Sequence, residues 1–301
     1  MKKIFVSTAC LKGDKNYNRV LDTYIHAGIK NIELTGVHPY MPENELKDLI
    51  KQYKSHGVEF TFHNYFPPPE LPIVMNFLSQ EKKNREDSKK IIVNAVELAK
   101  LTNTKIFAFH PGYLREADVN EKGYFNFKGK SRISFKKGLE IYRDVFFDFY
   151  QSLNINEDIY LGVENLFPNS DGTNDSFMCT YEELDELFRY EKINKLNLFL
   201  LLDLGHLAIS SNILNFNRYE YIEKCIENFG ERIFEIHISN NDEKNDLHNR
   251  ITKDSWQLES LKNFIHTGPK LSNTIFTYES RGLTIDQIKS DCDLIRHSID
   301  A

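Results

Sequence analysis

The sequence lacks a long hydrophobic run. None of its apolar stretches approaches the roughly 18 residues that a membrane-spanning helix needs. The apolar run that follows Lys2 and Lys3 is too short for the hydrophobic region of a secretory signal. We therefore expect a cytoplasmic protein with no membrane partner.

Cysteine is scarce. Four cysteines are spread over 301 residues, and no two of them form a CxxC pair: Cys10, Cys179, Cys225 and Cys292. This spacing argues against a disulfide scaffold and a cysteine-based zinc site. We expect four reduced thiols, which fits a cytoplasmic location.

An excess of positive charge is also missing. The chain has 38 Lys and Arg residues against 44 Asp and Glu residues, a formal net charge of −6. A strongly basic domain would have indicated a nucleic-acid partner. A local basic patch can still exist in an acidic chain, so nucleic acid stays an alternative partner that is not favoured.

Features that divide a chain into parts are absent as well. The sequence contains no internal repeat, low-complexity tract or Pro/Gly-rich linker, and its 41% hydrophobic content is ample for a core. No GxGxxG motif follows the first strand candidate, which argues against an open dinucleotide-binding sheet. We expect residues 1–301 to form one domain.

Short apolar runs alternate with longer amphipathic segments along the chain. This alternation is typical of parallel α/β folds. The eight strand candidates are residues 4–7, 31–34, 59–63, 105–110, 160–164, 198–203, 233–238 and 274–279. Eight such units in about 300 residues predict a single (β/α)8 TIM barrel, with an open doubly wound sheet as the runner-up.

Several intervening segments have the three- and four-residue apolar spacing of helices. The predicted helices are residues 85–101, 134–153, 182–190, 218–229, 255–266 and 284–297. Thr180 to Glu183 fits a capping box, and Asp175 with Ser176 offers further capping chemistry. The long connection over residues 111–132 contains three glycines and is predicted to be a functional lid.

Ionisable side chains follow six successive strand candidates near their C-terminal ends. They are His63, His110, Glu164, Asp203 with His206 three residues later, His237 and Glu279. The C-terminal ends of barrel strands meet at one mouth, where active sites form. Burying so many charges together is costly unless a cation compensates them.

The mixture of histidine and carboxylate indicates the kind of cation. Nitrogen with oxygen ligands suits zinc, manganese or cobalt better than calcium or magnesium. Asp246 and His248 are two residues apart, so in extended backbone both point the same way, as further ligands near His237. Glu235 should point into the barrel beneath His237, as an outer partner or a paired core carboxylate. The sequence therefore predicts a site for one to three divalent ions.

These residues resemble the xylose-isomerase-like TIM barrel superfamily, which includes sugar isomerases, ketohexose 3-epimerases, inosose dehydratases and endonuclease IV. The resemblance covers nearly the whole chain. Glu164, Asp203, His237 and Glu279 look like the four metal ligands of the epimerase branch. That resemblance implies that Glu164 and Glu279 also exchange protons with the substrate. It likewise implies that His206, in the Asp203-Leu-Gly-His206 segment, contacts substrate as a catalytic residue.

Endonuclease IV offers a longer match. The nine positions that hold its three zinc ions look like His63, His110, Glu164, Asp203, His206, His237, Asp246, His248 and Glu279. The chain lacks the glycine-rich stretch that follows the Asp-x-His of endonuclease IV, and it lacks the small glycine-rich loop after the first strand. The segment that begins His63-Asn-Tyr-Phe-Pro is more similar to the sugar phosphate isomerase/epimerase group.

Three functions follow from these observations. The favoured one is a divalent-metal-dependent sugar or sugar-phosphate isomerase or epimerase that transfers a proton through an enediolate. The first alternative is an endonuclease IV-like phosphodiester hydrolase acting on abasic DNA, and the second is an inactive binding protein of the same fold. The candidates for substrate binding are Arg281, Asn165 and Tyr65. For a phosphate they are Lys122, Lys128, Lys130 and Arg132, although a solvated lid is favoured there. The oligomeric state is left open.

Overall fold

Eight parallel strands close into a barrel in the computed structural model, which describes residues 2–119, 125–129, 131–153, 155, 159–190, 196, 198–266 and 268–300. The strands follow the order β1-β10-β9-β8-β7-β4-β3-β2 around the ring. They are β1 (Ile4–Ser7), β2 (Asn31–Leu34), β3 (Glu59–His63), β4 (Ile106–Phe109), β7 (Tyr160–Glu164), β8 (Leu198–Asp203), β9 (Ile233–Ile238) and β10 (Ile275–Tyr278). The predicted TIM barrel is confirmed, and the open sheet is wrong.

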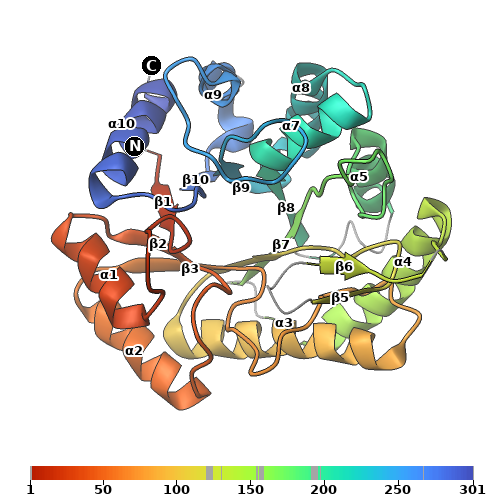
Figure 1. The fold of residues 1–301 in the computed structure, drawn as a ribbon, viewed down its shortest axis with the longest axis horizontal. Coiled ribbons are helices and arrows are strands. Elements are labelled where there is room, and N and C mark those ends of the chain that lie inside the picture. Colours follow the sequence, from red (N-terminus) through yellow and green to blue (C-terminus); the bar gives the residue numbers. More distant parts are fainter. Residues whose placement is uncertain are drawn as a thin grey trace.

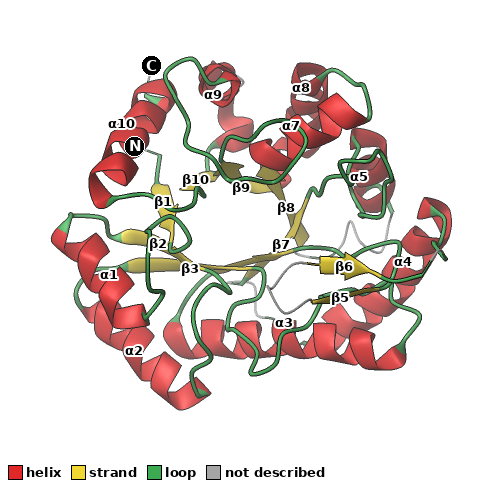
Figure 2. Cartoon of the chain, in the orientation of Figure 1, coloured by secondary structure: helices red, strands yellow, loops and turns green. Residues whose placement is uncertain are grey.

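Helices surround this ring of strands (Figures 1 and 2). They are α1 (Tyr17–His26), α2 (Glu43–Ser55), α3 (Lys82–Thr102), α4 (Phe135–Ser152), α5 (Tyr181–Phe188), α7 (Leu204–Ile213), α8 (Arg218–Phe229), α9 (Trp256–His266) and α10 (Ile285–Ile299), with short 3-10 turns at Gly230–Arg232 and Gly268–Leu271. The six predicted helices are all present. In the described part of the chain, no helix is both long and apolar enough to cross a membrane.

Two capping expectations had different outcomes. Thr180 and Glu183 form the predicted capping box at the start of α5. Asp175 caps nothing there, because α5 begins at Tyr181. Its carboxylate instead accepts hydrogen bonds from Arg115 and Asn169, both at 2.9 Å. The capping prediction for Asp175 and Ser176 was therefore wrong.

The predicted helices did not include α1, α2 or α7, and the predicted strands did not include β5 or β6. Helix α7 follows β8 without a loop and is buried on nearly all sides, so it has no polar face that would mark its period. The segment predicted to be a lid contains a small antiparallel hairpin, β5 (Ala117–Val119) with β6 (Phe125–Phe127). This hairpin lies outside the strand ring (Figure 1).

Aromatic side chains fill the N-terminal end of the barrel interior. Tyr160 stacks on Phe234 with ring centroids 4.5 Å apart, and Phe199 lies 5.2 Å from Phe234. Phe5 on β1 is buried and packs in the same cluster as Phe234. We call these four residues the aromatic floor. It closes one end of the barrel and leaves the opposite end, the mouth, for polar side chains.

Candidate metal centre

Strand geometry brings the polar residues of the mouth together. His63, Glu164 and Asp203 are the last residues of β3, β7 and β8. Side chains alternate between the two faces of a strand, and these three lie on the face that points into the barrel. His237 points inward from the penultimate position of β9. His110 and Glu279 lie one residue beyond the observed ends of β4 and β10, which are shorter than the predicted strands. His63, Glu164, Asp203, His237 and Glu279 are buried.

Glu164, Asp203, His237 and Glu279 form a first cluster, which we call the first metal position. Glu164, Asp203 and His237 each offer a ligand atom, and these atoms lie within 4.8 Å of one another. His237 Nδ1 is 3.0 Å from Glu279 Oε2 and 3.7 Å from Asp203 Oδ2. Glu164, Asp203 and His237 thus form one group of candidate ligands, and Glu279 joins it through its contact with His237.

His63, His110 and Glu164 form the second metal position. Their ligand atoms also lie within 4.8 Å of one another. Glu164 Oε2 is 2.9 Å from His63 Nε2 and 3.1 Å from His110 Nε2. Glu164 therefore belongs to both groups of candidate ligands and would be available to an ion at either position.

Asp246 stands between His206 and His248 and marks a third, looser position. Asp246 Oδ2 is 2.8 Å from His248 Nε2 and 3.8 Å from His206 Nε2. The hydroxyl of Ser280 donates a hydrogen bond of 2.7 Å to the His248 carbonyl, which ties this loop to the end of β10. His248 adopts a φ of 48°, an uncommon backbone conformation that turns its buried side chain into the mouth.

Two oxygen atoms at these positions have no hydrogen-bond donor. Asp203 Oδ2 and Asp246 Oδ1 are buried, and neither accepts a hydrogen bond in the described structure. Such unsatisfied acceptors are expensive in a protein interior. A divalent cation would satisfy them, and the mixed nitrogen and oxygen donors suit zinc, manganese or cobalt. The residues present therefore fit a metal centre.

Mutual charge interactions shift the pKa values of these groups. Burial alone would raise the pKa of Glu164, but His110, His206 and His63 outweigh it and hold that pKa well below its usual range. Burial alone would lower the pKa of His63, yet Glu33 and Glu164 raise it to about 9. Without metal, His63 thus carries a proton at neutral pH, which offsets the negative charge of Glu33 and Glu164.

Asp203 has a structural task besides its place in the cluster. Its Oδ1 caps α7 by accepting a hydrogen bond of 2.6 Å from the His206 backbone N–H, while Oδ2 faces the cluster. Gly205 is required in this turn, because a Cβ there would collide with the Ser239 hydroxyl. The turn thus fixes Asp203 and His206 on adjacent sides of the mouth.

The residues predicted to bind substrate lie in different surroundings. Asn165 is buried, and its amide group binds the backbone of Asp203 through bonds of 2.7 and 3.0 Å. The Tyr65 hydroxyl accepts a hydrogen bond of 3.0 Å from the Met75 N–H. Arg281 is exposed beside the end of β10.

The lid residues proposed to bind a phosphate do not form a cluster in the described part of the chain. Lys122 and Lys130 lie outside the described residues. Lys128 is exposed and pairs with Asp118 at 2.5 Å, and Arg132 is also exposed.

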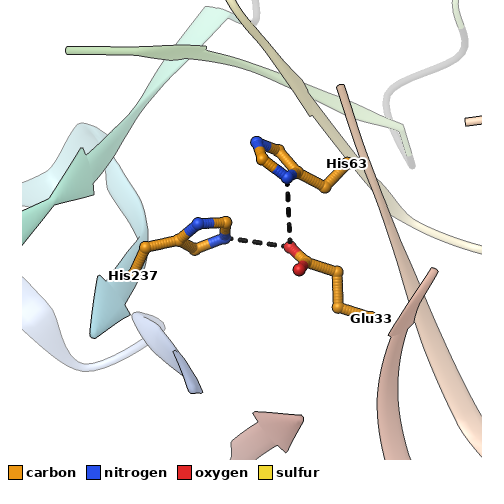
Figure 3. Close-up of side chains that lie close together, drawn as sticks. All are labelled: Glu33, His63 and His237. Carbon is orange, nitrogen blue, oxygen red and sulfur yellow. Dashed lines mark ion pairs between the residues drawn. The ribbon is translucent and has the colours of Figure 1, made fainter. Parts of the chain in front are cut away.

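The sequence reasoning missed Glu33 on β2. Glu33 is fully buried, and its Oε2 is 2.9 Å from His237 Nε2 and 3.9 Å from His63 Nδ1 (Figure 3). These three residues also offer ligand atoms within 4.8 Å of one another. The only sign of Glu33 in the sequence was a single acidic residue between the apolar residues Ile32 and Leu34. Glu235 occupies a similar level, 3.6 Å from His237 Nε2, and accepts a hydrogen bond from Thr277.

Known structures share this architecture. The chain aligns with a D-tagatose 3-epimerase-like protein at TM-score 0.70 and 19% identity, covering 100% of this chain and 97% of that one. It aligns with endonuclease IV from Thermus thermophilus at TM-score 0.63 and 15% identity, covering 100% and 99%. A D-allulose 3-epimerase from Methylomonas sp., in complex with D-allulose, gives TM-score 0.64 and 13% identity, covering 99% and 93%.

At these identities the likeness establishes the fold. No curated protein sequence matches the chain. A family model does match it over residues 22–268, which is most of its length. The chain therefore belongs to the xylose isomerase-like TIM barrel family.

Proposed function

We propose that this protein is a divalent-metal-dependent isomerase or epimerase of a sugar or sugar phosphate. The observation that carries the proposal is the group of ligand atoms from Glu164, Asp203 and His237, with Glu279 beside it in contact with His237. Two glutamates in one buried cluster provide a pair of groups that can hold an ion and exchange a proton. Structural neighbours that are named as epimerases, one with D-allulose bound, support this reading.

The chemistry divides between the ion and the chain. The ion, when bound, would polarise a substrate carbonyl and so acidify the neighbouring carbon. Glu164 comes from β7 and Glu279 follows β10, so they approach the mouth from strands on either side of β8 and β9. One would remove the proton from the substrate carbon, and the other would return it.

Nearby residues would position the substrate. We assign His206 to substrate contact, because it is buried beside Glu164 with Nδ1 3.1 Å from Oε1. Arg281 would orient an anionic group at the rim, and Tyr65, two residues after β3, would contact the substrate from that strand. Asn165 would act through Asp203, since its amide already holds the backbone of that residue.

The test is a panel of ketoses and sugar phosphates incubated with protein in heavy water. Wild type should exchange the carbon-bound hydrogen of one sugar with solvent. Glu279→Gln should lose this exchange while it keeps much of the metal, because an amide oxygen can still coordinate. No exchange with any sugar, together with cleavage of an abasic-site duplex, would contradict the proposal.

The second candidate function is a phosphodiester hydrolase, which the second and third positions favour. His63 and His110 with Glu164, and Asp246 with its two histidines, are groups that a one-metal epimerase does not need. Clustered ions can generate hydroxide and stabilise a leaving oxygen. In that case His110→Ala should lower duplex cleavage by orders of magnitude, whereas epimerase activity should change far less.

A further inference from the structure

The buried carboxylate of Glu33 lies between two histidines of the mouth. It comes from β2, where its register partners are Ser7 on β1 and Thr61 on β3. Thr61 precedes His63 by two residues on the same strand face, so Glu33 lies one layer below the metal positions. Figure 3 shows one of its oxygens directed at both His63 and His237.

Both histidines turn their other nitrogen toward a metal position. His237 directs Nδ1 at Glu279 and Asp203, at 3.0 and 3.7 Å, and directs Nε2 at Glu33. His63 directs Nε2 at Glu164, at 2.9 Å, and its Nδ1 lies 3.9 Å from both Glu33 Oε2 and Glu279 Oε1. Glu33 thus faces Nε2 of His237 and shares Nδ1 of His63 with Glu279.

An imidazole that binds a metal needs a lone pair on the ligand nitrogen. The proton of the neutral ring then lies on the other nitrogen, which needs an acceptor when it is buried. A carboxylate in that place fixes the tautomer and the ring orientation and makes the ligand more basic. Neither oxygen of Glu33 has a hydrogen-bond donor in the described part of the chain, and His237 Nε2, 2.9 Å from Oε2, has no other hydrogen-bond partner there, so the two groups are free to pair.

We propose that Glu33 is the shared positioning carboxylate of His237 and His63, and that it couples the first and second metal positions. The inference rests on the proposed metal centre. Loss of Glu33 weakens both positions together, because one residue orients a ligand in each. Glu235 provides the contrast, since among the two histidines it approaches His237 alone, at 3.6 Å.

The competing assignment makes Glu33 itself a ligand, with His63 and His237 completing its group. That arrangement requires the opposite ring nitrogens, Nδ1 of His63 and Nε2 of His237. The protons would then face Glu164 and Glu279. The two assignments therefore predict opposite tautomers for both histidines.

The first experiment reads these tautomers in the wild-type protein. Histidine-selective 15N labelling and long-range 1H–15N correlation of the Zn²⁺-loaded protein should show His237 bound through Nδ1 and His63 through Nε2. The reverse pattern at either histidine would overturn the proposal. It would leave the metal centre itself intact, and a wild-type protein that binds no Zn²⁺ would instead defeat the proposed function.

The second experiment compares Glu33→Gln with the matched control Glu235→Gln in a Zn²⁺ titration against a chelator. Glu33→Gln should weaken both the first and the second binding step by about 10–100-fold, the usual effect of removing an outer partner. Glu235→Gln should leave the step that depends on His63 unchanged. Denaturant unfolding in EDTA checks that both variants fold. If Glu33→Gln does not fold, Glu33→Asp takes its place. Both steps within twofold of wild type, or a loss confined to one step, would overturn the coupling.

Discussion

The two ends of the barrel interior use the same strands for opposite purposes. At the N-terminal end the aromatic floor packs rings 4.5–5.2 Å apart, which buries apolar area without unpaired polar groups. At the mouth, further along the same strands, buried carboxylate oxygens lack donors. The comparison indicates that the floor stabilises the fold, whereas the mouth lowers stability in exchange for a ligand site.

Asp203 is where the two roles meet. One of its oxygens caps α7 as a structural residue would, and the other faces the cluster without a hydrogen bond. A substitution that keeps the capping oxygen and replaces the other one should therefore change metal binding without changing the stability of the fold.

The largest expected effect comes from Asp203→Asn. Asparagine caps helices about as well as aspartate, so the free energy of unfolding in EDTA should change little. Metal affinity should fall by more than about 100-fold, because the amide oxygen stays with the cap and the NH2 group, which cannot coordinate, takes the place of Oδ2. Chelator competition and denaturant unfolding measure the two quantities. Asp203→Ala is the control, and it should also lose about 1 kcal/mol of stability with the cap. Unchanged affinity in Asp203→Asn would refute this role.

Phe5→Ala tests the opposite end of the barrel. Phe5 is buried in the aromatic floor, so truncation should cost about 3–5 kcal/mol of unfolding free energy. The metal content of the folded fraction should stay that of wild type. Denaturant unfolding with elemental analysis checks both statements. Metal loss from the folded variant would show that the two ends are not independent.

The affinity for metal should depend on pH. His63 has a raised pKa of about 9, so in the metal-free protein it is protonated at pH 7 and must lose that proton to bind an ion. Affinity for Mn²⁺ should therefore rise between pH 7 and 9, by up to about tenfold per pH unit for each proton released. Calorimetry over this range measures the slope. The exposed variant His26→Gln should keep it, and a flat profile would contradict the account.

Thr284→Ala is expected to have the smallest effect. Thr284 forms a capping box with Gln287 at the start of α10, outside the mouth. Its loss should cost about 1 kcal/mol of unfolding free energy and leave metal binding unchanged. Thr180→Ala, at the similar box of α5, should behave alike in urea unfolding. A change in metal affinity in either variant would show that metal binding depends on helix caps outside the mouth, which would contradict this prediction.

Most of the barrel could be predicted because the strands are apolar runs with short, regular spacing. The strand-end residues were visible for the same reason, since His63, Glu164 and Asp203 interrupt such runs at their last position. Glu33 was missed because it stands one position before the end of β2, where a lone acid gives no sign of the histidines from β3 and β9. Helix α7 was missed because burial on nearly all sides removes its polar face.

Other features depend on contacts distant in sequence. The spacing of Asp246 and His248 predicted a shared direction. Their approach to His206 also depends on the φ of 48° at His248 and on the hydrogen bond from Ser280. Likewise, the engagement of the Asn165 amide with the Asp203 backbone follows from the pairing of β7 with β8. Such pairings are set by the closed barrel and leave no local pattern.

The central claim is that the mouth is a divalent metal centre, and elemental analysis of protein purified without chelators tests it most directly. Wild type should retain at least one zinc, manganese or cobalt ion per chain, while Asp203→Asn prepared in parallel retains far less. A wild-type protein that holds none of these ions and takes up none on addition, with Asp203→Asn indistinguishable from it, would contradict the account.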